Sequence, residues 1–272
     1  MRPSLHAAAQ AVLLETDPER KCAQVREFAE RWEGGLWGLC PDEPVPVLIE
    51  AGRPARPVLV PPDQVPNRRL SAADGHAALL HAIAHIEFNA INLALDCVFR
   101  FRGLPTDFYA GWVRVALEES EHFALVCERL AALGACYGDW PAHNGLWEMC
   151  LKTADDPMAR MALVPRVLEA RGLDATPPIM AKLKRIGDEA SLAVLEIILR
   201  DEVGHVALGD QWFRYFCAQR GLEPEAQYRA LIREFDAPWP RPPLNRDARR
   251  QAGFSEAELD ALERPRGRRS DR

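Results

Sequence analysis

Six side chains of the kind that bind metal ions recur in the sequence in two matching sets. Each set has one glutamate, followed 32 or 33 residues later by the pattern Glu-x-x-His. The six residues are Glu87, Glu119 and His122 in the first set, and Glu169, Glu202 and His205 in the second. Carboxylate and imidazole groups together suit iron or manganese. The repeated spacing predicts that the chain contains one ligand-bearing unit twice.

The six candidate ligands fall on four predicted helices, over about residues 74–101, 107–133, 157–185 and 188–219. At about 100° per residue, apolar residues fill one stripe of each helix, and the candidate ligands lie inside these stripes. A buried carboxylate without a partner costs several kcal/mol, which is comparable with the stability of a small domain. Lysine and arginine do not occur on the stripes near the carboxylates. Metal ions are therefore the predicted partner.

The two spacings also predict how the helices pair. In an antiparallel helix hairpin, residues equally far from the turn lie opposite each other, which places the turns near residue 103 and near residue 185 or 186. Gly103-Leu104-Pro105 and Gly187-Asp188 supply turn residues at these places. Two hairpins with one Glu and one Glu-x-x-His each are the arrangement of ferritin-like di-iron and di-manganese proteins. We therefore expect an all-α fold with a ferritin-like four-helix bundle over residues 67–220.

The segments outside the bundle predict a three-part organisation. Residues 1–66 read as two short helices, the second starting at Asp17-Pro18, followed by a Pro-rich strap over residues 41–66 that is predicted to be extended. Residues 221–272 read as two short helices, about 224–235 and 255–263, and a basic tail. Within the bundle, Gly172 and Thr176-Pro177-Pro178 predict that the third helix stops after Glu169 and restarts. Residues 139–148 read as a loop that either caps a substrate channel or plugs one end of the bundle.

Two further residues are predicted to support the metal ligands. Asp201 precedes Glu202, and in similar carboxylate-bridged proteins an acid at this place accepts a hydrogen bond from the ring N–H of the histidine in the other set. This resemblance implies such a bond from His122, with a surface acid as the alternative. His85 lies two residues before Glu87, about 200° round the helix, so it is expected to pack beside the cluster or support it rather than bind metal.

The net charge, the cysteines and the lengths of the apolar runs restrict the binding partners and the cellular compartment that we expect. The net charge of −6 provides no overall basic field for a phosphate backbone, which argues against nucleic-acid binding. The seven cysteines include no CxxC pair, and neither a secretory leader nor an apolar run of about 18 residues is evident. We expect a cytoplasmic protein without a membrane span.

Several strings carry a resemblance that goes beyond the ligand pattern. They are His85-Ile86-Glu87, Glu118-Glu119-Ser120-Glu121-His122-Phe123, and those over residues 137–148, 169–174 and 201–206. With these strings the sequence resembles an uncharacterised bacterial ferritin-like family, known only as a domain of unknown function, over about residues 7–220. It is more distantly similar to the tRNA hydroxylase of the ferritin-like superfamily. The resemblance implies a ferritin-like fold and a dinuclear metal site, and it implies no reaction.

The predicted site favours an O2-dependent oxidase or hydroxylase of an unidentified organic substrate, supplied with electrons by an external donor. Two irons can together deliver two electrons to O2. The strap and the C-terminal extension argue against packing into a storage cage, and Val126 occupies the place of a radical-storing tyrosine. A tRNA substrate would need a local arginine patch. A metal-binding sensor or scaffold without turnover, and a metal-free network of buried acids, are the alternatives. Carboxylate and imidazole ligands accept both iron and manganese, and the oligomeric state is not determined by the sequence.

Overall fold

The computed structural model describes residues 2–65 and 74–264, and within them the regular structure is helical, with isolated β-bridges and no strand. The all-α prediction is confirmed. The chain forms two compact units, Met1–Ala154 and Asp155–Arg272, which we describe separately. The ferritin-like arrangement and the three-part organisation stay predictions.

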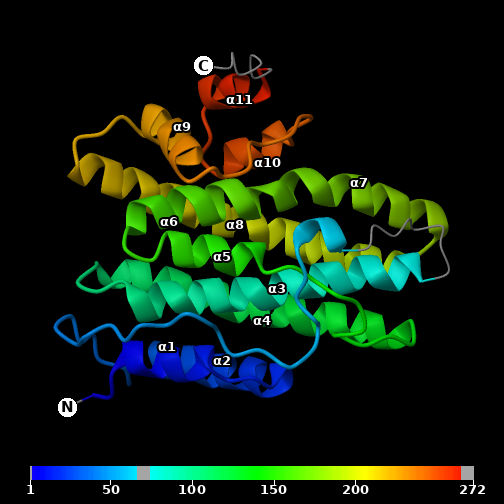
Figure 1. The fold of residues 1–272 in the computed structure, drawn as a ribbon, viewed down its shortest axis with the longest axis horizontal. Coiled ribbons are helices and arrows are strands. Elements are labelled where there is room, and N and C mark those ends of the chain that lie inside the picture. The colour runs from blue at the N-terminus through cyan, green and yellow to red at the C-terminus, as the bar shows by residue number, and fades with distance from the viewer. Residues whose placement is uncertain (1, 66–73, 265–272) are drawn as a thin grey trace. The chain divides into compact units, whose positions relative to one another are not determined.

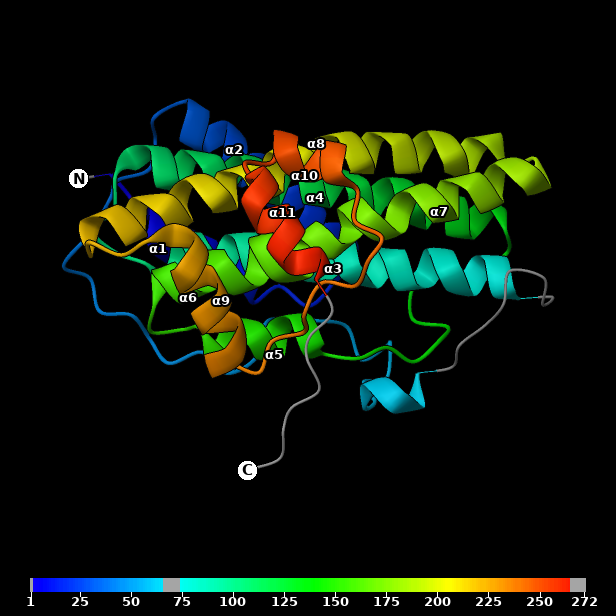
Figure 2. The same ribbon diagram turned by 90° about the horizontal axis from the view of Figure 1, so that it is seen from above.

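The first unit is built on a long helical hairpin, α3 (Gly75–Arg100) and α4 (Thr106–Ala132), shown side by side in Figures 1 and 2. Gly103 takes a φ of +69° in the turn, a left-handed conformation that glycine adopts without strain, and Pro105 is the N-cap of α4. The predicted first turn is confirmed. α1 (Leu5–Leu13) packs on α3, and α2 (Pro18–Glu33), which starts at Asp17 as predicted, packs on α4.

α3 is the central helix of this unit. It is long and apolar enough to cross a membrane by length and composition, but most of it is buried in the protein, where it packs against α1, α4 and α5 (Gly145–Lys152). The neighbours on several sides make it a core helix. They do not cover Ile86, which has 48% of its area exposed although its spacing along α3 would suit the apolar stripe.

The Pro-rich strap has no helix or strand from its first turn to the short 3-10 helix η1 (Pro62–Gln64), as its proline content predicts. An extended course for the strap stays a prediction. The backbone N–H of Val60 donates a hydrogen bond of 2.8 Å to the Ala142 carbonyl. The predicted loop over residues 139–148 is wrong from Gly145 on, because α5 begins there. Trp147, buried on α5, donates its ring N–H to the Ile49 carbonyl at 2.9 Å and so joins α5 to the strap.

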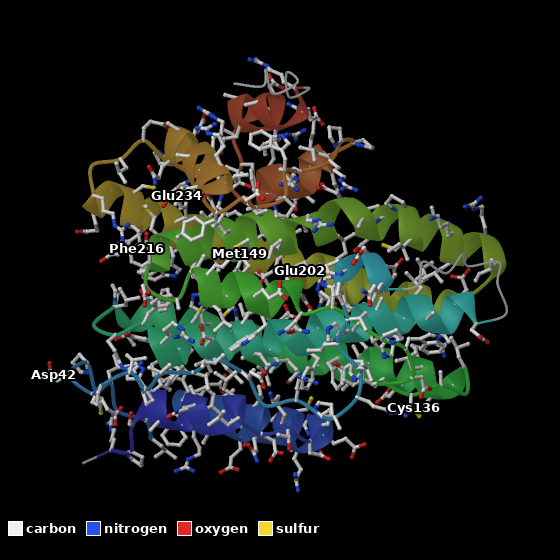
Figure 3. All side chains as sticks on the ribbon, in the orientation of Figure 1. Asp42, Cys136, Met149, Glu202, Phe216 and Glu234 are labelled. Atoms are coloured by element: carbon white, nitrogen blue, oxygen red, sulfur yellow. The ribbon has the colours of Figure 1, made fainter. Side chains whose placement is uncertain are left out.

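The second unit pairs an irregular helix with a long straight one. Its first helix starts as α6 (Pro157–Leu163), continues as the π-helix η2 (Val164–Glu169) and ends as α7 (Ala170–Ile186). Gly187, with a φ of +75°, forms the predicted second turn into α8 (Glu189–Gln219), which packs back along α7 and α6. In both units side chains fill the space between the paired helices (Figure 3).

The C-terminal part of the second unit contains α9 (Pro224–Glu234), α10 (Arg246–Gln251) and α11 (Glu256–Glu263). α9 and α11 match the predicted helices. α10 has no apolar stripe in its sequence and was not predicted. The basic tail lies outside the described residues, apart from its first residues Glu263 and Arg264.

The predicted stop and restart at Gly172–Pro178 is wrong, because α7 runs through both prolines without a break. Pro177 has no N–H, so the Leu173 carbonyl lacks its usual donor within the helix. The Asn245 side chain supplies one instead: its Nδ2 donates to the Leu173 carbonyl at 3.1 Å. A residue 72 positions away thus replaces the missing hydrogen bond.

Replacing Asn245 tests this compensation. We expect Asn245→Ser, which can still cap α10, to lower the free energy of unfolding by about 1 kcal/mol, because a buried carbonyl is left unsatisfied. In a Pro177→Ala background the backbone N–H returns, and the same substitution should then cost less than half as much. Urea titration of the four proteins measures both values. An equal loss in the two backgrounds would contradict the proposed compensation.

Candidate metal centre

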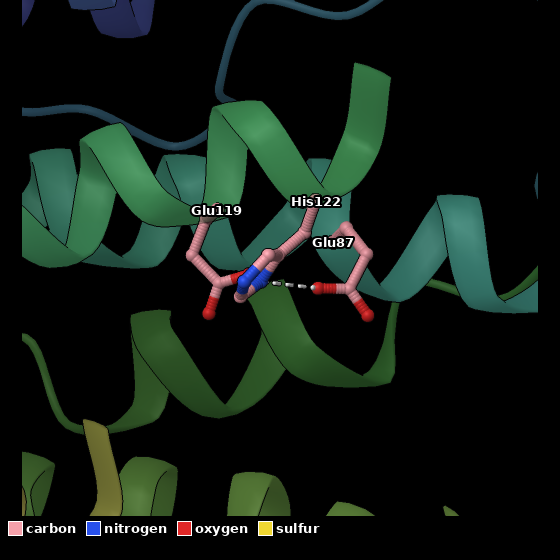
Figure 4. A group of neighbouring side chains, drawn as sticks. All are labelled: Glu87, Glu119 and His122. Atoms are coloured by element: carbon pink, nitrogen blue, oxygen red, sulfur yellow. Dashed lines mark hydrogen bonds and ion pairs between the residues drawn. The ribbon is translucent and has the colours of Figure 1, made fainter. Parts of the chain in front are cut away.

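The first unit brings three predicted ligands together at the middle of the α3–α4 hairpin. Glu87 projects from α3, and Glu119 and His122 project from α4, so that the three side chains point toward one another (Figure 4). His122 Nδ1 lies 3.4 Å from Glu87 Oε2 and 3.4 Å from Glu119 Oε2. One ligand atom from each residue falls within 4.8 Å of the other two, and all three residues are at most 3% exposed. We call this cluster the first half-site.

The charges of the first half-site depend on one another. Burial raises the pKa of Glu87 well above its ordinary value, and the negative charge of Glu119 raises it further. Burial alone lowers the pKa of His122, but hydrogen bonds and charges from Glu119 and Glu87 outweigh burial and bring it to about 11. A protonated imidazole therefore supplies the positive charge that the two buried carboxylates need when no metal ion is bound.

The second predicted set, which we call the second half-site, is Glu169, Glu202 and His205 in the second unit. Among the described residues, Glu169 belongs to no group of three ligand atoms within 4.8 Å of one another, so the structure does not bring it together with the other two at that distance. Glu202 and His205 are one turn apart on α8, with His205 Nδ1 at 3.6 Å from Glu202 Oε2, and both are buried. Glu169, 8% exposed, is the last residue of η2. A β-carbon built on Gly172, in the first turn of α7, would lie 3.7 Å from Glu202 Oε1. The Glu202 carboxylate therefore lies beside the turn that follows Glu169.

The π-helix places Glu169 differently from an unbroken α-helix. A π-turn adds a residue to the turn and so rotates the side chains that follow it. η2 can pack against α8 because α8 has a glycine at the contact: a β-carbon on Gly209 would lie 2.3 Å from Pro165 Cγ. Pro165 within a predicted helix and Gly209 on the apolar stripe of the next are unusual residues for these positions. Their close approach was not predicted from the sequence.

A buried arginine of η2 is held by the C-terminal helices. Arg166, fully buried, pairs with Glu258 of α11 at 2.6 Å and with Asp210 of α8 at 3.0 Å. Tyr228 of α9 donates its hydroxyl to the Arg166 carbonyl at 2.9 Å, and the guanidinium lies 4.2 Å from the centre of the tyrosine ring. Farther along, Arg249 of α10 donates to the Ala170 carbonyl at 3.2 Å. These contacts fix the backbone on both sides of Glu169, and none of them could be read from helical periodicity.

Asp201 and His85, which were predicted to support the metal ligands, form hydrogen bonds with other residues. Asp201 accepts hydrogen bonds from the Arg200 guanidinium at 2.8 and 3.1 Å. His85 places Nδ1 at 2.9 Å from the Tyr137 hydroxyl and Nε2 at 3.0 Å from the His143 carbonyl. Both ring nitrogens of His85 are thus engaged by groups outside the six candidate ligands. The hydrogen bond from His122 to Asp201 and a supporting role for His85 stay predictions.

Comparison with known proteins establishes the family. The model of a family described as "Protein of unknown function (DUF455)" matches residues 14–260. The chain belongs to the DUF455 family. The match begins later than the resemblance expected over about residues 7–220, and at its C-terminal end it continues to residue 260, through α9 and α10 and into α11. The family description names no activity, so we infer the chemistry of this DUF455 chain from its side chains.

One relative of this DUF455 chain is an "Uncharacterized protein" of Haemophilus influenzae (strain ATCC 51907 / DSM 11121 / KW20 / Rd). It is 44% identical over 262 residues, which are 92% of this chain and 91% of the relative. No solved structure matches the chain.

The first half-site of the DUF455 chain fits a divalent metal ion by its donor set and burial. It offers two carboxylates and one imidazole, which iron and manganese accept. Glu87 Oε2 is buried and makes no hydrogen bond of good geometry within the described part of the chain, although His122 is 3.4 Å away. An oxygen in this position is suited to a cation. In the second half-site, Glu202 and His205 provide the same two kinds of donor.

Metal binding should release protons. Because hydrogen bonds and charges from Glu119 and Glu87 raise the pKa of His122 to about 11, the imidazole holds a proton near pH 7 when no metal is bound, and a metal ion must displace it. We expect the apparent affinity for Mn²⁺ or Fe²⁺ to rise between about pH 6 and about pH 8, since protons compete less at higher pH. Calorimetric titration in buffers of different ionisation enthalpy counts the protons. Binding that is independent of pH and of buffer would contradict this protonation state.

Proposed function

We propose that this protein holds two metal ions, iron or manganese, with three ligands from each unit: Glu87, Glu119 and His122, and Glu169, Glu202 and His205. The observation that carries the proposal is the first half-site, in which three ligand atoms lie within 4.8 Å of one another in a buried position. The second unit repeats the Glu-x-x-His pattern on α8, with its imidazole 3.6 Å from its carboxylate. The equal spacing of the two sets supports their joint use, as in ferritin-like carboxylate proteins.

We propose further that the centre serves an O2-dependent oxidase or hydroxylase acting on an organic substrate, with electrons from an external donor. When bound, two irons supply two electrons to O2. The chain itself supplies carboxylates that neutralise the charge of the ions, imidazoles that complete the ligand set and buried surroundings that keep water away. The contacts of Arg166 and Arg249 on either side of Glu169 hold the backbone that carries this carboxylate. The proposed substrate is a small molecule or a macromolecule, including tRNA, and the proposed location is the cytoplasm.

The alternative is a metal-binding sensor or scaffold without turnover. The observation that favours it is the arrangement in the first half-site, where the imidazolium of His122 lies between two carboxylates and supplies positive charge without metal. Metal could then act by changing stability through binding to the folded state alone.

Metal stoichiometry in matched variants tests the shared centre. We expect about two ions per chain, and we expect Glu119→Gln or Glu202→Gln to weaken the binding of both ions, because each variant removes a carboxylate from one common centre. The controls Glu121→Gln and Glu196→Gln make the same change of charge on exposed faces of α4 and α8 and should retain two ions. Loss of one ion in each variant, with the other bound as before, would mean two independent sites. Fewer than about one ion per wild-type chain would reject the metal centre.

Oxygen consumption separates the enzyme from the sensor. We expect protein loaded with Fe²⁺ under anaerobic conditions to consume O2 when mixed with it, and a chemical reductant to sustain the uptake. Glu121→Gln should behave like the wild type, and Glu119→Gln should not consume O2 above the rate of free Fe²⁺. Full occupancy by iron with no uptake above that rate would favour the sensor.

A further inference from the structure

The π-helix η2 adds an extra residue to the helix that carries Glu169. The backbone N–H of Ala170 donates to the Pro165 carbonyl, five residues earlier. In an α-helix it would donate to the Arg166 carbonyl, four residues earlier. The α-helical structure of α7 begins at Ala170. The Arg166 carbonyl therefore loses its α-helical donor near the junction between the two kinds of helix.

A tyrosine from another helix donates to this carbonyl instead. Tyr228 of α9, 1% exposed, places its hydroxyl oxygen 2.9 Å from the Arg166 carbonyl oxygen. Burial raises the pKa of Tyr228 to about 12, so the hydroxyl keeps its hydrogen near pH 7 and acts as the donor. A side chain 62 positions away thus supplies the hydrogen bond that the π-turn withholds from Arg166.

The Tyr228 hydroxyl is held in place by the packing of its ring. The Arg166 guanidinium lies 4.2 Å from the centre of this ring, and the ring centres of Phe213 and Phe254 each lie 6.2 Å from it. Arg166 is held in turn by Glu258 of α11 at 2.6 Å. A ring enclosed in this way has little freedom to move its hydroxyl to another carbonyl.

The helix is anchored on both sides of the extra residue. Arg166 holds the side before Glu169. On the other side, Asp174 pairs with Arg249 at 2.6 Å and accepts a hydrogen bond from the Asn245 backbone N–H at 2.8 Å. Expelling the extra residue would rotate one of these anchored segments by about 100°. Moving the π-turn along the segment between them would not, so its position depends on which carbonyl has a donor from outside the helix.

Glu169 is the last residue of the π-turn and is therefore sensitive to the position of the turn. Side chains within the turn change direction when the extra residue moves past them. The Glu202 carboxylate lies beside the next turn of the helix, 3.7 Å from a β-carbon built on Gly172. A change in the direction of Glu169 would therefore change how it approaches Glu202.

We propose that Tyr228 is a positioning residue for Glu169: its hydroxyl fixes the π-turn at the Arg166 carbonyl and thereby sets the direction of the Glu169 carboxylate. The position of the turn is a property of the second unit alone. Its consequence for metal binding rests on the proposed metal centre, in which Glu169 is a ligand. Tyr228→Phe isolates the effect, because it keeps the ring and removes only the hydroxyl.

Hydrogen exchange of the full-length, metal-free protein tests the position of the turn. We expect Tyr228→Phe to speed exchange in residues 164–170 at least about fivefold, because the turn loses the donor that fixes it. Exchange in α8 is the reference within the same unit and should change less than about twofold. Tyr109→Phe is the matched control: the buried Tyr109 hydroxyl donates to the Phe101 carbonyl at 3.1 Å, and its loss should leave residues 164–170 at the wild-type rate.

A double-mutant cycle on Mn²⁺ affinity tests whether Tyr228 acts through Glu169. We expect Tyr228→Phe to weaken Mn²⁺ binding about fivefold and Tyr109→Phe to bind like the wild type. Glu169→Gln should weaken binding at least as much. Adding Tyr228→Phe to Glu169→Gln should then change the affinity less than about twofold, because the direction of a missing carboxylate no longer matters. Circular dichroism and melting temperature confirm that each variant is folded.

The proposal is overturned if Tyr228→Phe leaves exchange in residues 164–170 at the wild-type rate. It is also overturned if this variant binds Mn²⁺ like the wild type, or if its loss of affinity adds in full to that of Glu169→Gln, since additive losses mean that Tyr228 does not act through Glu169. If the wild type binds no metal, the proposed function fails, and the exchange experiment still supports or overturns the role of Tyr228 in the turn. The two proposals therefore fail separately.

Discussion

A carboxylate removed from water needs a positive charge close by, and this requirement governs both units. In the first unit, Glu87 and Glu119 share the imidazole of His122 at 3.4 Å. In the second unit, Asp210 and Glu258 share the guanidinium of Arg166. The two solutions differ in one respect. A guanidinium cannot give up its proton in a protein, whereas an imidazolium can, so only the first cluster can exchange a proton for a metal ion.

The irregular backbone of the second unit is stable because other parts of that unit donate the missing hydrogen bonds. Proline at 165 and at 177 removes an N–H from the helix in each case. Tyr228, Arg249 and Asn245, all from the C-terminal helices, donate to carbonyls along η2 and α7. The C-terminal helices are therefore part of the structure that carries Glu169, which agrees with their inclusion in the family match.

α3 shows how one helix can serve two purposes. One face carries Glu87 toward α4, and another carries the buried amides Asn89 and Asn92 toward the strap. Each of these amides has a hydrogen-bond partner inside the unit: Lys21 donates to Asn92 Oδ1, and Asn89 Nδ2 donates to the His85 carbonyl. These partners explain how α3 can carry two asparagine side chains while most of the helix is buried.

The sequence by itself determined the long helices and their pairing into two hairpins, because helical period, turn glycines and the equal spacing of the ligands are local or symmetric signals. It placed α3, α4 and α8 to within a few residues, and it placed Glu87, Glu119 and His122 in one buried group. Only the tertiary structure decided that α7 passes through Pro177, because the donor that makes this possible is distant Asn245. The same holds for α5, for the π-helix before Glu169 and for the exposure of Ile86. In each case the deciding contact joins residues whose proximity no periodicity encodes.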